Sequence, residues 1–290
     1  MKVAIFGVSG QLGRDVAAAL SDVDAVPLDH ARVDVRDAPA TMGAIRTLRP
    51  DWVINCAAMT HVDRCETEAL AAFEANALGA ANVARAAHAA GARLLQVSTD
   101  YVFDGARPGA YAESDPPHPI NIYGMSKLAG EWAALAECAS ACVVRSSGLY
   151  GLNPCRGKGG NFVETMLARA ASGPLRIVSD EVLAPTFTED LAHRMREMID
   201  RDAPPGVYHA TSAGSCSWFE FAQEIVRLSG AGAKVEPIRA AEWKAAARRP
   251  ANSVLENRAF AALGFGAMPH WRDALARYLR QRAGAPAGGS

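Results

Sequence analysis

Five short apolar runs, separated by stretches of helical composition, constrain the fold of this chain more than any other feature. The runs span residues 3–6, 25–28, 52–54, 94–97 and 141–144. Helices are expected at about 11–21, 38–48 and 66–90, and another begins near Ile122. Because strands that alternate with helices form βαβ units, this pattern predicts an α/β chain with a doubly wound parallel sheet between two layers of helices.

The pattern of the sequence changes after Tyr150. Glycines and Pro154 mark a long loop there, and the helix and strand candidates beyond it are shorter and less regular. We expect a nucleotide-binding domain over residues 1–148 and a smaller, mainly substrate-binding α/β lobe over residues 149–282, which could be interleaved with the first. The tail 283–290 consists mostly of glycine and alanine and is expected to be disordered.

Charge and cysteine content exclude several classes of protein. Lysine and arginine number 30 against 31 aspartate and glutamate, so no broad basic surface is available for nucleic acid or an anionic membrane. The first apolar run is too short for a signal peptide, and no 18-residue apolar run follows. The six cysteines lack the spacing of zinc sites. We expect a soluble cytoplasmic protein with reduced thiols.

A glycine-rich turn at residues 7–13 lies between the first strand and the first helix. Its glycines would allow a tight turn, close approach of a pyrophosphate and close packing of helix on strand, while the helix N-terminus offers free N–H groups. The spacing is G-x-x-G-x-x-G, and a glycine-rich turn without a ligand is the alternative interpretation. We predict a Rossmann-like dinucleotide site with contacts from Gly7, Ser9, Gly10, Gln11, Leu12 and Gly13.

The end of the second strand bears on the choice of cofactor. Asp29 could accept hydrogen bonds from the adenosine ribose, which favours NADH. His30 and Arg32 follow at once and could neutralise the 2′-phosphate of NADPH. The sequence therefore predicts NADPH or NADH as the cofactor and leaves the preference open.

Two further segments are expected beside the cofactor. Asp34 and Val35 lie where an adenine amino group could be met, although a solvated loop carboxylate is an equal interpretation. Ala57 and Ala58 follow the third strand, and their small size would let the backbone lie along the cofactor. Cys56 is interpreted as a small buried residue and not as a nucleophile.

Three residues suggest carbonyl chemistry. Thr99 ends the fourth strand, and Tyr123 and Lys127 share one face of the following helix because they are four residues apart. A nearby ammonium group stabilises a phenolate, which would bring the pKa of Tyr123 down toward working pH for a general acid. Thr99 would hydrogen-bond the same carbonyl oxygen. Tyr123 and Lys127 are also expected to contact the cofactor.

Together these motifs resemble those of the dTDP-4-dehydrorhamnose reductase family, within the extended short-chain dehydrogenases/reductases. The resemblance is carried by residues 7–13, 55–58, 98–105, Tyr111 with Glu113, Pro119 with Asn121, and residues 123–127, 160–162, 184–186 and 249–253. It implies an oxidoreductase of dTDP-rhamnose biosynthesis that uses NAD(P)H to reduce the 4-keto group of dTDP-6-deoxy-L-lyxo-4-hexulose, giving dTDP-L-rhamnose. In this resemblance Thr99, Tyr123 and Lys127 are the catalytic triad.

The resemblance also implies a set of residues that bind the nucleotide-sugar. Arg249 would grip the diphosphate, because a guanidinium group binds phosphate oxygens in bidentate fashion. Phe162 is equally well interpreted as part of a helix core. The implied set is Asp100, Tyr101, Gly148, Asn161, Phe162, Arg249 and Asn252.

Gly148 departs from the family, which usually places at this position a tryptophan that packs on the sugar. The departure predicts either weak binding of the usual precursor or an opening for a bulkier sugar. We favour weak binding, so that Gly148→Trp is expected to lower KM.

A second departure concerns Mg²⁺, which some members bind through glutamates at a dimer contact. Here Asp15, Glu189 and Gln281 stand at those positions. We expect no bound metal, and a homodimer remains an open prediction.

Two other functions remain as alternatives. An epimerase or 4,6-dehydratase could use the same fold, although a dehydratase needs an Asp-Glu pair after the catalytic threonine, where this chain has Asp100 and Tyr101. A non-catalytic NAD(P)-binding regulatory subunit is the other.

Overall fold

The computed structural model describes residues 1–154 and 160–284. Its main sheet has six strands in the order β10-β5-β4-β3-β1-β2, and every neighbouring pair is parallel. The strands are β1 (Lys2–Phe6), β2 (Asp24–Leu28), β3 (Trp52–Asn55), β4 (Arg93–Thr99), β5 (Ala141–Ser146) and β10 (Gly206–His209). The predicted Rossmann-like α/β class is confirmed, and all five apolar runs are strands.

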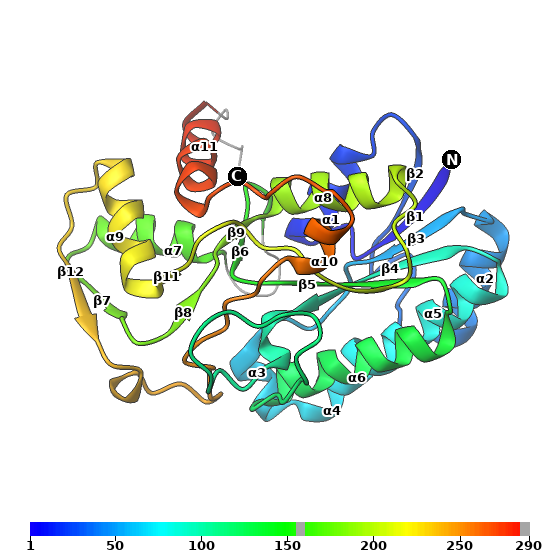
Figure 1. Cartoon of the computed structure of the whole chain (residues 1–290), viewed down its shortest axis with the longest axis horizontal. Coiled ribbons are helices and arrows are strands. Elements are labelled where there is room, and N and C mark those ends of the chain that lie inside the picture. The colour runs from blue at the N-terminus through cyan, green and yellow to red at the C-terminus, as the bar shows by residue number, and fades with distance from the viewer. Residues whose placement is uncertain (155–159, 285–290) are drawn as a thin grey trace.

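Helices cover both faces of this sheet (Figure 1). On one face α1 (Gln11–Ala19) packs against α8 (Thr188–Asp200), and on the other lie α2 (Ala38–Leu48), α5 (Gly79–Ala89) and α6 (Ile122–Glu137). Each face buries an apolar cluster, with β3 and β5 buried along their whole length. The sheet is therefore rigid where its carboxyl ends meet the site.

The helix predicted over residues 66–90 is broken into pieces. The chain forms α3 (Val62–Thr67), α4 (Ala69–Phe73), a π-helical turn (Glu74–Leu78) and then α5. The alanine-rich composition favours one helix, but Asn76 overrides it. Its amide nitrogen donates to the Met59 carbonyl (3.1 Å) and to Ser126 Oγ (2.9 Å), and its Oδ1 accepts from the Met59 N–H (2.8 Å). These bonds tie the turn to α6.

A second group of elements surrounds an aromatic core. Short strands pair as β6 (Leu149–Tyr150) with β9 (Thr186–Phe187), β7 (Leu175–Val178) with β12 (Val235–Ile238), and β8 (Val182–Leu183) with β11 (Cys216–Ser217). The helices of this group are α7 (Phe162–Ala170), α9 (Trp218–Ser229) and α11 (Trp271–Gly284), with a 3-10 turn at Ala240–Glu242. By contrast, α10 (Arg258–Ala262) packs on β10, and a 3-10 turn at Asp100–Val102 packs on α6. Tyr150, Phe187, Phe221, Trp271 and Tyr278 fill the core.

The two groups of elements are interleaved along the chain. After β9 the chain returns to the main sheet, where α8 packs on α1 and β10 extends the sheet beside β5. The predicted division near residue 149, between a cofactor-binding part and a mainly substrate-binding part, stays a prediction. The predicted disordered tail falls mainly on residues 285–290, which, like Cys155, lie outside the described residues. Along the described chain, no helix combines the length and the apolar character needed to cross a membrane.

Candidate active site

A cavity of about 320 Å³ lies beyond the carboxyl ends of the central strands and brings together residues from both halves of the chain. It is lined by thirteen of the predicted site residues: Gly10, Gln11, Leu12, Gly13, Ala58, Thr99, Asp100, Tyr101, Tyr123, Lys127, Gly148, Asn161 and Phe162. The lining mixes the glycine-rich turn, the triad and the start of α7. Cofactor and substrate chemistry would therefore meet in one place.

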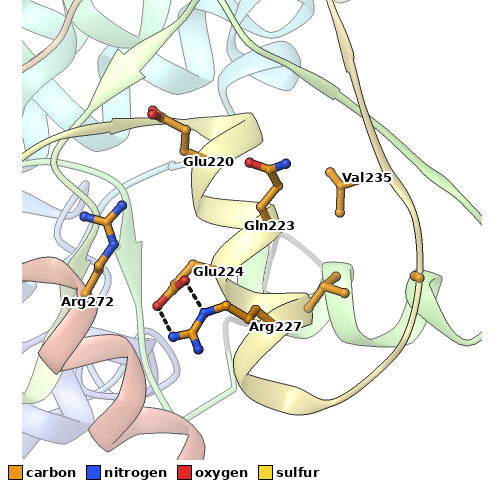
Figure 2. Close-up of a pocket in the computed structure, with 8 residues that line it drawn as sticks. Glu220, Gln223, Glu224, Arg227, Val235 and Arg272 are labelled. Atoms are coloured by element: carbon orange, nitrogen blue, oxygen red, sulfur yellow. Dashed lines mark hydrogen bonds and ion pairs between the residues drawn. The ribbon is translucent and has the colours of Figure 1, made fainter.

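Figure 2 shows a different hollow, on the outer side of α9. Glu220, Gln223 and Glu224 project from that helix, and Arg272 approaches from α11. The Glu224 carboxylate accepts hydrogen bonds from Arg227 Nε at 2.8 Å and from Arg227 Nη2 at 2.7 Å. The lining contains no predicted site residue and no triad, so this hollow is not the candidate active site.

The glycine-rich turn uses its three glycines in different ways. Gly7 has a φ of +74°, and a Cβ atom there would lie 2.5 Å from the backbone nitrogen of Ala57. At Gly13 a Cβ atom would lie 2.3 Å from the carbonyl oxygen of Gly7, whereas at Gly10 the same oxygen is 3.2 Å away. The fold therefore requires glycine at positions 7 and 13. Gly10 lines the cavity, which fits the approach of a pyrophosphate.

This difference makes Gly10 the position at which cofactor binding can be tested. Gly10→Val is expected to fold but to abolish measurable NADPH and NADH binding, because the branched side chain would enter the space of the pyrophosphate. Fluorescence titration of both cofactors gives the readout. Gly43→Val is the matched control, since Gly43 is exposed on α2 with no atom within 4 Å of its added Cβ. Unaltered titrations in a folded Gly10→Val protein would disprove the site.

The residues predicted around the adenosine lie at the end of β2, outside the cavity lining. Asp29 Oδ1 accepts from the Arg32 N–H at 2.9 Å, and Arg32 Nη1 donates to the Pro27 carbonyl at 3.2 Å. Arg36 grips Asp34 with its guanidinium at 2.7 Å, which lowers the pKa of that carboxyl. Acidic and basic groups are thus intermixed here, as expected, and their roles toward the cofactor remain predictions.

Val35 and Ala57 are placed in the framework behind the cavity. Val35 is buried among the apolar side chains beneath α5, in contact with Gly79. Ala57 packs against Gly7, and its N–H donates to Asn55 Oδ1 at 3.1 Å. The structure gives both residues a packing role, and their predicted contact with the cofactor is untested. Ser9 lies in the same turn and is half-buried.

The triad is assembled from the end of β4 and the first turns of α6. Asn121 caps that helix by accepting from the Gly124 N–H at 2.7 Å, which places Tyr123 at its start. The Tyr123 phenol hydrogen-bonds to Thr99. Lys127 Nζ is buried and donates to the Val97 carbonyl at 2.7 Å. The predicted juxtaposition of the three residues is present.

The protonation states differ from the sequence-based expectation. Burial raises the pKa of Tyr123 above its ordinary value near 10, and the hydrogen bond from Thr99 offsets this only in part. The expected depression of this pKa by Lys127 is wrong: desolvation of the buried phenol is the largest effect, and nearby Asp100 raises the pKa further. Burial also lowers the pKa of Lys127 to about 8, against the opposing effects of Glu131 and Cys56. A protonated phenol beside a titrating amine suits proton donation.

The pKa of Lys127 predicts how activity depends on pH. The ammonium stabilises the phenolate left when Tyr123 gives up its proton, and this help is lost as pH rises through about 8. Reductive kcat/KM is therefore expected to fall above that pH. Lys127→Arg should remove the falling limb, because a guanidinium stays protonated throughout. A profile that is flat in the wild type, or an unchanged limb in Lys127→Arg, would contradict the assignment.

A buried ion pair holds α6 against the sheet. Arg145 on β5 makes a forked contact with Glu131 on α6, with Nη2 to Oε2 at 2.7 Å and Nε to Oε1 at 2.9 Å. Ser98 Oγ donates to the same carboxylate at 2.5 Å. Burial and Arg145 lower the pKa of His209 to about 3, so this neighbour is neutral. The pair fixes the helix that carries Tyr123 and Lys127.

Asp100 links three segments at the rim of the triad. Its Oδ1 accepts from the Thr99 hydroxyl at 2.9 Å, its Oδ2 accepts from Ser147 Oγ at 2.7 Å, and Ser253 also bonds to it. Burial raises the pKa of the carboxyl. Tyr101 packs edge-on against Tyr123, with ring centroids 5.9 Å apart. Asp100 therefore orients Thr99 and joins the 249–253 segment to the sheet.

Two predicted residues at the start of α7 are held by the fold. Asn161 caps the helix by accepting from the Glu164 N–H at 3.0 Å, and its amide nitrogen donates to the Gly151 carbonyl at 2.8 Å. Phe162 packs on Trp218, with centroids 4.5 Å apart. Both residues line the cavity, and Trp218 lines it too.

Two other predicted substrate residues are engaged elsewhere. Arg249 pairs with Asp63 on α3 at 2.8 Å and donates to the Ala247 carbonyl at 3.1 Å. Asn252 donates to the carbonyls of Arg107 and Gly109 at 3.0 and 2.6 Å, so it anchors that loop. Neither residue belongs to the described lining of the cavity. The structure gives Asn252 a role in anchoring the loop, and its contact with substrate stays a prediction, whereas Arg249 would have to exchange its carboxylate partner for a phosphate.

Comparison with known proteins identifies the family. The family model for the RmlD substrate binding domain matches residues 1–283. The chain belongs to this family. A dTDP-4-dehydrorhamnose reductase from Streptomyces griseus is 38% identical over 297 residues, covering 98% of this chain and 96% of its own. The spore coat polysaccharide biosynthesis protein SpsK of Bacillus subtilis (strain 168) is 37% identical over 287 residues, covering 98% and 99%.

A solved structure of the same family is similar throughout. The dTDP-4-dehydrorhamnose reductase from Bacillus anthracis, in complex with NADP, matches with a TM-score of 0.92 at 38% identity, covering 97% of this chain and 100% of that one. The resemblance inferred from the motifs is confirmed, and so is the fold of the extended short-chain dehydrogenases/reductases.

The alternative to weak binding, an opening at Gly148 for a bulkier sugar, is not seen. Gly148 has a φ of +54°, and a Cβ atom there would lie 2.6 Å from Leu183 Cδ1 and 3.3 Å from Pro185 Cα. The space of a side chain at position 148 is therefore already filled by Leu183. This corrects the expectation that Gly148→Trp alone would improve substrate binding, because the indole would collide with that leucine.

The three positions that the resemblance associates with Mg²⁺ are engaged in hydrogen bonds within the fold. Gln281 Nε2 donates to Glu189 Oε2 at 3.0 Å, and Asp15 accepts from Thr188 and from Asn153, the latter at 2.6 Å. Over residues 1–154 and 160–284, no group of three or more His, Cys, Asp or Glu side chains is arranged to hold a metal ion. That no metal is bound remains a prediction.

Residues around β8 were missed by the sequence analysis. Glu181, Val182, Leu183 and Ser253 all line the cavity. Burial raises the pKa of Glu181, and nearby Arg249 opposes the rise. This carboxyl group can accept hydrogen bonds from sugar hydroxyls. The only sequence signal for these four residues was their position, because they lie just before the 184–186 segment or at the end of the 249–253 segment, both of which carried the resemblance.

Proposed function

We propose that this chain is an NAD(P)H-dependent reductase of the 4-keto group of a nucleotide-activated 6-deoxysugar, with dTDP-4-dehydrorhamnose as substrate and dTDP-L-rhamnose as product. The cavity in which Thr99, Tyr123 and Lys127 meet the glycine-rich turn carries the proposal. The family supports the choice of sugar, because the relative from Streptomyces griseus is named for this reaction.

The chain's own residues supply the proton and the positioning. A bound dinucleotide supplies the hydride that adds to the carbonyl carbon. Tyr123 transfers its phenolic proton to the carbonyl oxygen, and burial keeps that proton in place until the transfer. Thr99 holds the same oxygen by a hydrogen bond once its single hydroxyl proton turns from Asp100 to the substrate, and Lys127 stabilises the remaining phenolate.

The cofactor is NADPH or NADH. The basic groups Arg32 and Arg36 near the end of β2 suit the 2′-phosphate of NADPH, and the relative from Bacillus anthracis holds NADP. Asp29 suits the free ribose hydroxyls of NADH. Besides the nucleotide-sugar, the partner that we propose is a second copy of the chain, in a homodimer. The proposed location is the cytoplasm.

The alternative enzymes fit the site less well. A 4,6-dehydratase needs a second carboxyl group after Asp100, and here that position holds Tyr101, whose ring packs against Tyr123. A non-catalytic cofactor-binding subunit would have no use for a complete triad in an open cavity.

A substrate panel tests the proposal. NADPH and NADH oxidation are followed with dTDP-, UDP- and GDP-linked 4-keto-6-deoxysugars, and products are identified by NMR. We expect fastest oxidation with dTDP-4-dehydrorhamnose and formation of one dTDP-L-rhamnose per cofactor oxidised. Product formation without net cofactor oxidation would instead indicate an epimerase or dehydratase. Cofactor binding without turnover of any sugar would indicate a regulatory subunit.

A further inference from the structure

Leu183 occupies a fixed place in the wall of the active-site cavity. Its strand β8 pairs with β11 through Cys216. On the other side, the Val182 N–H donates to the Ala251 carbonyl and the Ser253 N–H to the Val182 carbonyl, both at 2.8 Å. The leucine is 3% exposed. The backbone of β8 is therefore held between two segments, and the leucine side chain is buried where it lines the cavity.

The leucine lines the same cavity as the reacting groups. It meets the position of a side chain at residue 148, and Ser146, two residues earlier, pairs with Thr99 across β5 and β4. Ser147, between them, bonds to Asp100. An apolar side chain thus faces the cavity that also holds the hydroxyl expected to bind the carbonyl oxygen of the substrate.

We propose that Leu183 is the apolar contact for the deoxysugar ring in this enzyme, and that it replaces from β8 the side chain that Gly148 lacks. This rests on the proposed function. A 6-deoxysugar has an apolar edge at its methyl group, and a leucine packs against such an edge without offering a hydrogen bond. Gly148 and Leu183 then form one unit, in which a larger residue 148 requires a smaller residue 183.

The first arm of the test truncates the leucine. Leu183→Ala is expected to raise KM for dTDP-4-dehydrorhamnose about tenfold with little change in kcat, since the contact is made equally in ground and transition states. NADPH binding should be unchanged. Leu175→Ala is the matched control, because Leu175 is equally buried in the same lobe on β7 but lies outside the cavity lining. Its KM should stay at the wild-type value.

The second arm tests whether the effect of Gly148→Trp on kcat/KM changes sign between two backgrounds. Gly148→Trp should lower kcat/KM in the wild-type background and raise it in the Leu183→Gly background, where the indole has space. The backbone strain at the positive φ of residue 148 is common to both backgrounds and cancels in the comparison. If Gly148→Trp alone does not fold, the KM of Leu183→Ala still tests the proposed contact.

The outcomes separate this inference from the proposed function. Normal wild-type turnover with an unchanged KM in Leu183→Ala overturns the role of Leu183 and leaves the reductase assignment intact. A wild-type protein that turns over none of the 4-keto-6-deoxysugars overturns the proposed function, and this inference with it.

Discussion

Replacing Tyr123 with phenylalanine is expected to lower kcat by about 10²-fold or more, the range for loss of a positioned general acid. The ring remains, so the packing against Tyr101 and the folded state should be preserved. Only the hydroxyl that bonds to Thr99 is removed. Steady-state reduction of dTDP-4-dehydrorhamnose measures the loss, and titration with NADPH should give nearly the wild-type Kd.

Tyr101→Phe provides the comparison, because both tyrosines line the cavity and burial raises the pKa of both. The phenol of Tyr123 bonds to the catalytic threonine, whereas Tyr101 reaches that threonine only through its backbone N–H at 3.2 Å, which the substitution leaves in place. A neutral hydrogen bond is worth about 1 kcal/mol, so the effect of removing the Tyr101 hydroxyl should stay below about tenfold. A larger loss in Tyr101→Phe than in Tyr123→Phe would transfer the acid role to Tyr101.

The first five strands could be predicted because each is a local signal. Residues in β3 and β5 are all buried, and their sequences are apolar runs up to the polar residues at their carboxyl ends, Asn55 in β3 and Arg145 and Ser146 in β5. The sixth strand, β10, has no such signal. It is four residues long, begins with a glycine and is defined by pairing with β5, far away in the chain. Its place in the sheet depends on long-range packing that propensity does not describe.

The site divides in the same way, into residues predicted from local signals and residues whose roles depend on long-range contacts. Motif spacing predicted Thr99, Tyr123 and Lys127, because a strand end and a helix face are local features. The side of the cavity that receives the sugar could not be predicted in this way. The consequence of Gly148 depends on Leu183, and the availability of Arg249 depends on Asp63. The pKa of Tyr123 likewise depends on burial, which the sequence pattern did not indicate.

Removing the buried charge of Glu131 is expected to have the largest effect on stability. Glu131 and Arg145 are 1% and 4% exposed, and breaking such a pair leaves an uncompensated charge in the interior. Glu131→Gln should lower the free energy of unfolding by about 3–5 kcal/mol, measured by urea denaturation. His209 beside Arg145 is neutral, so it cannot replace the lost carboxylate as a charged partner of that arginine.

Glu137 on the same helix is the matched control. It also meets an arginine, Arg85, at 2.7 Å, but the two side chains are 34% and 53% exposed. Glu137→Gln should therefore cost less than about 1 kcal/mol. Equal losses in the two variants would show that burial does not set the strength of the Glu131 pair.

The same substitution also has a catalytic consequence with a defined sign. The Glu131 carboxylate favours the ammonium form of Lys127 and so holds the pKa of that amine up, against the larger effect of burial. Without this charge the pKa of Lys127 falls, and the falling limb of kcat/KM should move to lower pH in Glu131→Gln, while Glu137→Gln leaves it in place. A merely structural role for Glu131 would lower the yield of folded enzyme without shifting the limb, so the direction of the shift separates support of the fold from tuning of the lysine.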